Sequence, residues 1–139
     1  MKFFMALVVL VASAIHAIGI RLDRCSLAEE MLKLDVPKDD LNKWACIAEY
    51  ESKFNTDFTR CRDTNKDYGI FQINDEKWCK PPTGNSLNKC NIECSSLLTD
   101  DISDSVKCAL QIKKEHGFAV WPSWKSCSHS LPSIDDCFK

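Results

Sequence analysis

The chain has 139 residues, and its 18 basic and 20 acidic residues give a formal net charge of −2. This length suits one compact domain with one hydrophobic core, so no second domain is expected. The mildly acidic balance argues against a nucleic-acid-binding protein and against long-range attraction to anionic surfaces, so a polyanionic target would have to be held by local contacts.

The N-terminal segment, residues 1–19, has the pattern of a secretion signal peptide. Lys2 is followed by an uncharged run whose apolar part extends from Phe3 to Val11, and small residues come next. We expect cleavage after Gly19, with cleavage after Ala17 as the alternative, which leaves a single domain at 20–139. An uncleaved membrane anchor is the competing interpretation, but its unbroken apolar part is short for a span. The predicted product is secreted and extracellular.

Two amphipathic helices are predicted next. The pattern at 26–29 is a capping box, and apolar residues then recur at helical spacing until Val36 and Pro37 end the run. A second helix is expected after Asp40, because apolar residues at i, i+3, i+4 and i+7 form a stripe that starts at Leu41.

Glu51 lies at the end of this second helix, at the margin of the apolar stripe, whereas Glu49 points away from the stripe. Burial disfavours the charged form of a carboxyl group, so we expect Glu51 to keep its proton more readily than Glu49. A helix-end glutamate in a structural ion pair is the alternative interpretation.

The strand-like runs 56–60 and 68–73 flank a polar turn and predict a small hairpin. Asp67 lies at the polar end of this hairpin, where the amides of Asn65, Gln72 and Asn74, together with water, would favour its ionised form. An aspartate that serves only the turn is the alternative. Glycoside hydrolysis needs two carboxyl groups in such unlike surroundings, one protonated and one ionised.

The second half of the chain is predicted to be less regular. Residues 75–98 contain turn formers and closely spaced cysteines, which indicate a loop held by disulfides. A core helix is expected to begin at residues 99–101, where acidic residues favour a helix N-terminus. The tail, 118–139, is expected to contain only short helical turns.

All nine cysteines follow the predicted signal, at positions 25, 46, 61, 79, 90, 94, 108, 127 and 137. In a secreted chain they indicate a disulfide framework. Zinc binding is disfavoured because the sequence contains no CxxC pair. Eight cysteines permit many pairings, among which spacing does not choose, and the ninth is left over.

Taken together, these features resemble the c-type lysozyme family, which includes the insect lysozymes and the related α-lactalbumins. The resemblance is carried by Arg24–Ala28, Trp44–Ala48, Tyr50–Ser52, Asp67–Asn74, Trp78–Cys79, Cys90–Cys94, Leu97–Leu98 and Ile134–Phe138. It covers essentially the whole mature chain and includes eight cysteines together with both acids, so it is more specific than any single motif.

The resemblance implies an α+β, lysozyme-like fold in which a helical lobe and a small antiparallel β lobe flank a cleft. The disulfides it implies are Cys25–Cys137, Cys46–Cys127, Cys79–Cys94 and Cys90–Cys108. Cys61 has no counterpart in this set, so a free thiol, an intermolecular bridge and a competing disulfide all stay open for it.

The same resemblance implies that Glu51 is the general acid and Asp67 the nucleophile or charge stabiliser of a retaining hydrolase, a mechanism of which lysozyme is the type case. Trp121 would pack against the acid. Gln72 and Asn74 would support the second carboxylate and contact acetamido sugars.

Two further positions bear on ligands. Trp78 would meet a sugar face, or alternatively be buried behind Cys79. Lys77 replaces an aromatic residue of many relatives, which predicts weaker sugar binding or an altered cleavage position. In the loop where some relatives bind calcium, Thr99 and Ser105 stand in place of carboxylates. We therefore expect no structural metal and no cofactor, and interpret Asp100, Asp101 and Asp104 as helix-start acids.

The sequence thus predicts a muramidase that hydrolyses β-1,4 bonds between N-acetylmuramic acid and N-acetylglucosamine, with an antibacterial or digestive role. Its expected partner is peptidoglycan or chitooligosaccharide, and the chain is expected to be a monomer that binds neither nucleic acid nor membrane. A non-catalytic sugar-binding or regulatory protein, like α-lactalbumin, is the alternative, and the presence of both acids argues against it. A small disulfide-rich toxin or inhibitor would leave the acids unexplained.

Overall fold

The computed structural model describes residues 19–139, so the predicted signal peptide lies outside the described residues except for Gly19. Its α-helices are α1 (Arg24–Lys33), α2 (Leu41–Ser52), α3 (Ser103–His116) and α4 (Trp124–Cys127). Its strands are β1 (Thr59–Cys61), β2 (Lys66–Tyr68) and β3 (Ile73–Asn74), and its 3-10 helices are η1 (Lys38–Asp40), η2 (Cys94–Leu97), η3 (Phe118–Val120) and η4 (Asp135–Phe138). No helix within 19–139 is long and apolar enough to cross a membrane.

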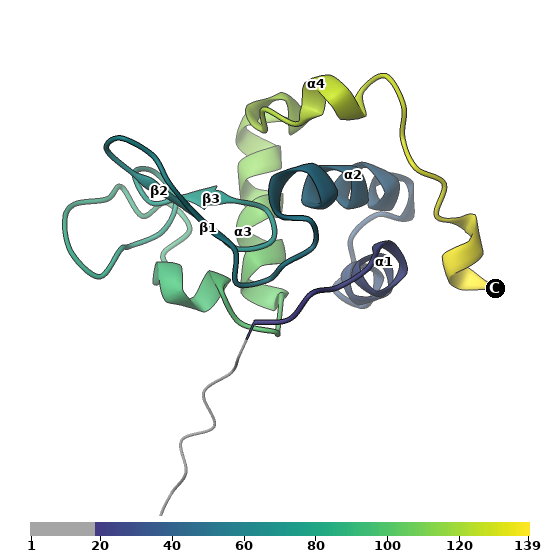
Figure 1. Cartoon of the computed structure of the whole chain (residues 1–139), viewed down its shortest axis with the longest axis horizontal. Coiled ribbons are helices and arrows are strands. Elements are labelled where there is room, and N and C mark those ends of the chain that lie inside the picture. The colour runs from purple at the N-terminus through teal and green to yellow at the C-terminus, as the bar shows by residue number, and fades with distance from the viewer. Residues whose placement is uncertain (1–18) are drawn as a thin grey trace, which may run out of the picture.

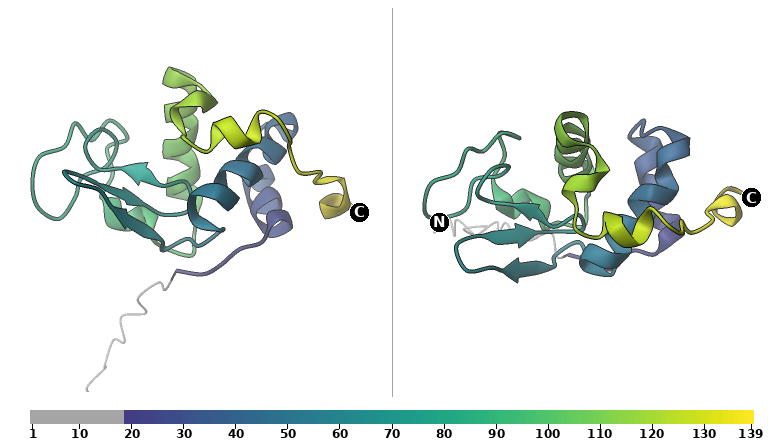
Figure 2. Two further views of the ribbon diagram at one scale, coloured as in Figure 1. Left: turned by 45° about the horizontal axis from the view of Figure 1, so that its top comes forward. Right: turned by 90° about the horizontal axis from the view of Figure 1, so that it is seen from above.

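The helices and the sheet occupy separate sides of the molecule. In Figure 1 the strands lie to the left of α3, while α1, α2 and the C-terminal segment lie to its right. Both views in Figure 2 keep this separation. The predicted α+β fold, with a helical part and a small antiparallel sheet, is confirmed.

Helix α1 begins earlier than the sequence pattern predicted. The Asp23 carboxylate accepts a hydrogen bond from the Ser26 backbone at 2.8 Å, and the Ser26 hydroxyl accepts one from the Asp23 backbone at 2.9 Å. Ser26 is therefore the third residue of the helix and not its cap, so the predicted cap was wrong. Asp23 occupies the N-cap position because its short carboxylate reaches the free N–H groups of the first turn.

Helix α2 begins where it was predicted, but Asp40 does not cap it with its side chain. The Asp40 carboxylate instead accepts hydrogen bonds from Lys43 at 2.7 Å and from Lys113 of α3 at 3.0 Å. This ion pair joins the start of α2 to α3. The core helix α3 itself begins at Ser103, slightly later than the predicted 99–101.

The sheet is antiparallel, with the order β1-β2-β3. Asp67 in the middle of β2 pairs with Arg60 of β1 and with Asn74 of β3. The predicted strand 68–73 is wrong, because the chain turns between Tyr68 and Ile73. Gly69 permits this turn through its φ of 78°, and a Cβ at this position would meet the Leu97 carbonyl.

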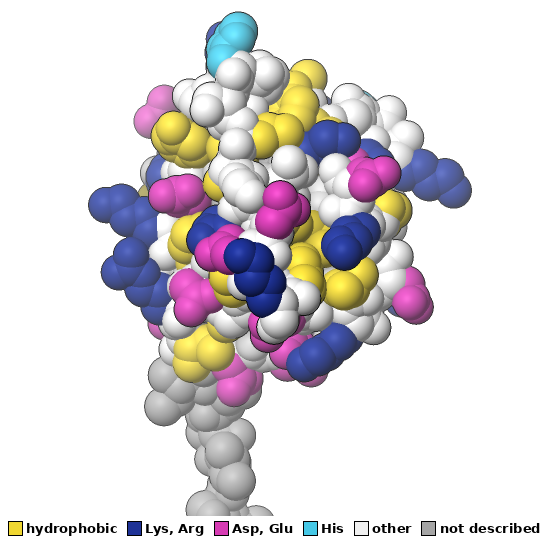
Figure 3. Space-filling model, turned by 90° about the vertical axis from the view of Figure 1, so that its right-hand side faces the viewer, with side chains coloured by type: hydrophobic (Ala, Val, Ile, Leu, Met, Phe, Trp, Pro, Cys, Tyr) yellow, Lys and Arg dark blue, Asp and Glu magenta, His cyan; other side chains and the backbone are white. Residues whose placement is uncertain are grey.

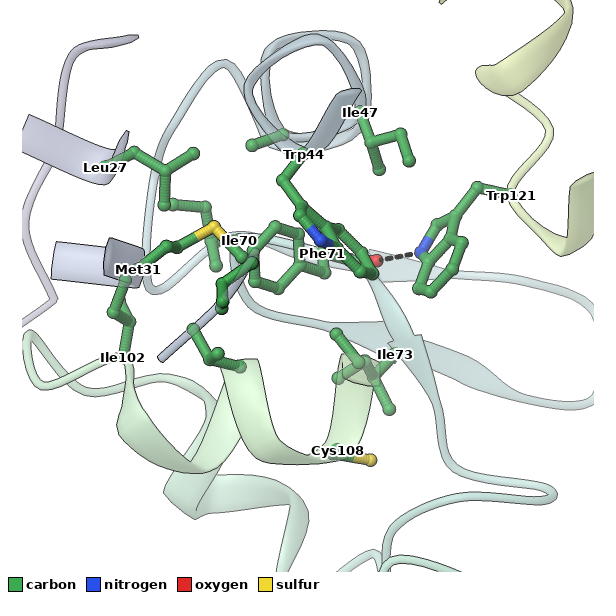
Figure 4. Close-up of a cluster of buried hydrophobic side chains, with 14 of the residues drawn as sticks. Leu27, Met31, Trp44, Ile47, Ile70, Phe71, Ile73, Ile102, Cys108 and Trp121 are labelled. Carbon is green, nitrogen blue, oxygen red and sulfur yellow. Dashed lines mark hydrogen bonds between the residues drawn. The ribbon is translucent and has the colours of Figure 1, made fainter. Parts of the chain in front are cut away.

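The apolar residues that suggested a longer strand are buried in the core instead. Ile70 and Phe71 have no exposed surface and lie among the side chains of the helices (Figure 4). Trp44 of α2 contacts Phe71, Phe118 and Trp121 in edge-to-face geometry, with ring centroids 5.0 to 5.3 Å apart. The tip of the hairpin between β2 and β3 therefore belongs to the helical core.

Four disulfides join the pairs that the family resemblance implied: Cys25–Cys137, Cys46–Cys127, Cys79–Cys94 and Cys90–Cys108. The first two attach the C-terminal segment to α1 and α2, and the other two hold the long loop after β3. Each bridge contributes about 2–5 kcal/mol in a small secreted domain. Cys61 is a free, exposed thiol on β1.

Candidate active site

A cleft of about 290 Å³ lies where the sheet meets the helices. It is lined by Glu51, Arg62, Asp67, Gln72, Ile73, Asn74, Trp78, Ile112, Val120, Trp121 and Pro122. These residues come from α2, β2, β3, α3 and the segments beside them. All the predicted site residues except the cysteines and Lys77 therefore line one cleft.

Glu51 projects into this cleft from the last turn of α2, and only 6% of it is exposed. The helix ends just after it, because Lys53 adopts a left-handed conformation with φ 52°. None of the ion pairs among residues 19–139 includes Glu51. The alternative interpretation, a helix-end glutamate in a structural ion pair, therefore finds no support in the described chain.

Asp67 is 4% exposed, but its carboxylate has polar partners on both oxygens. Arg62 donates through Nε to Oδ2 at 2.6 Å, and Asn74 donates through Nδ2 to Oδ1 at 3.2 Å. Asp67 raises the pKa of the Arg62 guanidinium through this hydrogen bond and its charge. Asp67 therefore has two side-chain donors, whereas Glu51 has no ion-pair partner within residues 19–139.

The sequence interpretation assigned the wrong neighbours to Asp67 in part. Gln72 lines the cleft, but its side-chain amide donates to the Phe58 and Gly69 carbonyls, each at 2.9 Å, and not to the aspartate. The sequence did not single out Arg62 as a site residue. Only its position in the turn between β1 and β2 points to it, and this position becomes informative once the pairing of these two strands is known.

The hairpin tip beside Asp67 is fixed by side chains from three parts of the chain. The carbonyls of residues 69–71 accept, in order, hydrogen bonds from Gln72 at 2.9 Å, from Ser52 at 2.8 Å and from Trp121 at 2.9 Å. Figure 4 shows the Trp121 contact. Ser52 follows Glu51 in α2, so this set of bonds ties the helix end that carries one acid to the hairpin that carries the other.

The two predicted cleft tryptophans are both mostly buried, each 4% exposed. Trp121 is held by its hydrogen bond to Phe71 and by packing on Trp44. Trp78 has the Lys89 ammonium 5.0 Å from its ring centre, and His116 lies edge-on at 5.6 Å. Trp78 thus lines the cleft with little free ring face, as in the alternative of a buried tryptophan behind a cysteine.

Outside the cleft, the charged groups of residues 19–139 do not form a second candidate catalytic or metal site. Between residues 19 and 139, one cluster has metal-ligand spacing, Cys25 with Asp136 and Cys137, and its two cysteines are bonded to each other. Asp101 accepts hydrogen bonds from the Ser103 hydroxyl and backbone, which lower the pKa of Asp101. On the face with the C-terminal segment, positive and negative side chains are interspersed (Figure 3).

Comparison with known proteins places these features in one family. A family model described as "C-type lysozyme/alpha-lactalbumin family" matches residues 20–137. Lysozyme 1 of Musca domestica is 52% identical over 141 residues, and Lysozyme P of Drosophila melanogaster is 50% identical, each alignment covering 99% of this chain and 100% of the relative. A crystal structure of canine milk lysozyme is 38% identical, with a TM-score of 0.74, and the match covers 80% of this chain and 92% of that one.

Proposed function

Because the chain belongs to the C-type lysozyme/alpha-lactalbumin family, we propose that it is a muramidase that cleaves β-1,4 bonds between N-acetylmuramic acid and N-acetylglucosamine in bacterial peptidoglycan. The observation that carries this proposal is the pair of buried carboxyl groups, Glu51 and Asp67, which line the same cleft in different surroundings. Glu51 takes part in no ion pair within residues 19–139, whereas Asp67 is held by two donors.

In this proposal Glu51 is the general acid. It donates its proton to the glycosidic oxygen as the bond from that oxygen to C1 of the sugar breaks. Asp67 stabilises the positive charge that develops at C1, and one of its oxygens bonds to C1 from the opposite side. Water then attacks C1, returns a proton to Glu51 and releases Asp67, so the product keeps the configuration of the substrate.

The other cleft residues support these two groups. Trp121 forms part of the wall of the cleft that Glu51 enters. Asn74 orients Asp67 through its amide N–H, while its side-chain oxygen accepts a hydrogen bond from the Glu76 backbone at 2.8 Å. Gln72 acts indirectly by holding the hairpin tip, and the small free area of Trp78 limits it to an edge contact. The ligand is peptidoglycan or a chitooligosaccharide, the chain acts as a monomer, and residues 1–19 direct its secretion.

The test compares wall clearing by three proteins: the wild type, Glu51→Gln and the matched control Glu49→Gln. The full chain is expressed in secreting cells, the released protein is added to a bacterial wall suspension from acidic to neutral pH, and turbidity is followed. Glu49 lies two residues earlier on the same helix and is exposed. We expect Glu51→Gln to lose at least about 100-fold in rate and Glu49→Gln to match the wild type.

Equal clearing by the wild type and Glu51→Gln would refute the role of Glu51. If no variant clears walls but all bind chitooligosaccharide, the chain is instead a non-catalytic sugar-binding member of the family. N-terminal sequencing of the secreted protein tests cleavage after Gly19, and its mass in solution tests the monomer.

A further inference from the structure

We propose that Arg62 is a positioning residue for Asp67: it fixes the orientation of the carboxylate in the cleft and thereby sets kcat. This inference rests on the proposed function, since it assumes that Asp67 acts at the reacting carbon. Arg62 is the one cation among the residues that line the cleft within 19–139.

The Arg62 contact is built from a fixed backbone. The Arg62 backbone N–H donates to the Asn65 carbonyl at 2.8 Å, which closes the turn before β2. From this turn the side chain reaches Asp67 with its Nε, at 2.6 Å from Oδ2. The Arg62 side chain is 45% exposed and that of Asp67 is 5% exposed, so the ion pair joins a partly exposed cation to a buried carboxylate.

Two donors together decide how the carboxylate lies. The terminal torsion of an aspartate is broad, so packing alone leaves the plane of the group loosely defined. Arg62 holds one oxygen and Asn74, on the neighbouring strand, holds the other. The Arg62 bond, at 2.6 Å, is shorter than the Asn74 bond at 3.2 Å, and it alone joins two opposite charges, so Arg62 is the dominant restraint.

Such a restraint matters for rate, because misplacing a reacting group by about 1 Å can cost roughly 100-fold. The strand that carries Asp67 has only three residues. Its backbone is paired with both neighbouring strands, and the contact from Arg62 adds a restraint on the side chain itself.

Arg60 provides an internal comparison. It pairs with Asp67 across the sheet, yet its guanidinium lies over the Phe58 ring, 5.6 Å from the ring centre. It is absent from the cleft lining, and no ion pair joins it to Asp67 in the described chain. Removing Arg60 or Arg62 changes the net charge equally, but only the second change removes a contact to the aspartate.

The experiment measures kcat and KM on a soluble chitooligosaccharide for the wild type, Arg62→Ala, Arg62→Lys and Arg60→Ala, together with thermal unfolding. We expect Arg62→Ala to lower kcat at least about tenfold, with KM within about twofold. Arg62→Lys should recover part of kcat, because it keeps the charge but not the fixed geometry of the guanidinium. Arg60→Ala should match the wild type.

A lower Tm with unchanged kcat in Arg62→Ala would show a purely structural ion pair and overturn the inference. An equal loss in Arg60→Ala would also overturn it, because net charge would then be the cause. If Arg62→Ala does not fold, Arg62→Gln takes its place with the same criteria. An inactive wild type would overturn the proposed function and this inference together, whereas an active wild type with an unaffected Arg62→Ala refutes the inference alone.

Discussion

Replacing Trp121 with phenylalanine removes the link between the cleft wall and the hairpin tip. The indole N–H donates to the Phe71 carbonyl at 2.9 Å, and both residues are buried. The change leaves this carbonyl without a partner, at a cost of about 1–3 kcal/mol. The smaller ring also leaves a gap beside Trp44, which adds about 1 kcal/mol. We therefore expect the free energy of unfolding to fall by about 2–4 kcal/mol.

The matched control is Trp124→Phe. Trp124 is partly buried and stacks on Phe118 at 4.9 Å, a contact that a phenylalanine ring retains, so its loss should stay below about 1.5 kcal/mol. Denaturant unfolding with the disulfides intact, followed by far-ultraviolet circular dichroism, measures both variants without relying on tryptophan fluorescence. If Trp121→Phe destabilises the protein no more than Trp124→Phe does, the hydrogen bond from Trp121 to the Phe71 carbonyl does not stabilise the hairpin tip.

Three further predictions concern stability and the free thiol. Burial alone would raise the pKa of Asp40, but hydrogen bonds from Lys43 and Lys113 lower this pKa below its ordinary value. The stabilisation is complete above the ordinary carboxyl pKa and is lost as pH falls through the lowered one. Asp40→Asn should therefore be less stable than the wild type at pH 7 by about 1–2 kcal/mol, and denaturant titrations should show the gap closing as the pH is lowered through the acidic range. Gly69→Ala should reduce both Tm and wall clearing, since its Cβ would collide with the Leu97 carbonyl; an unchanged Tm would contradict this. Cys61→Ser should leave Tm and clearing unchanged because the thiol is exposed and unpaired, and a drop in either would show that Cys61 contributes to the fold.

The main helices could be predicted because their apolar residues recur with the period of a helix. The hairpin tip could not, since Ile70 and Phe71 continue the apolar pattern of a strand while they pack into the helical core. The turn depends on the positive φ of Gly69 and on hydrogen bonds to the carbonyls of residues 69–71. Two of these carbonyls accept from donors in distant parts of the chain, Ser52 and Trp121. Periodicity contains no information about such long-range contacts.

The candidate site, like the fold, could be predicted from the sequence only in part. The positions of Glu51 and Asp67 were found from the helical stripe and the family resemblance, and both acids line the cleft. The partner of Asp67 was not found, because an arginine in a polar turn looks like any solvated cation. Gln72 was given a contact that its side chain does not make, since an amide in a hairpin can bond equally well to nearby backbone carbonyls.

The most direct test of the account is the anomeric configuration of the first product. Proton nuclear magnetic resonance of a soluble chitooligosaccharide, recorded in the first minutes before mutarotation, reports the new reducing end. If Glu51 and Asp67 act as described, the β anomer appears first in the wild type and Glu51→Gln forms no product on this timescale. An initial α anomer, or an equal rate in Glu51→Gln, would contradict the assignment of the two acids.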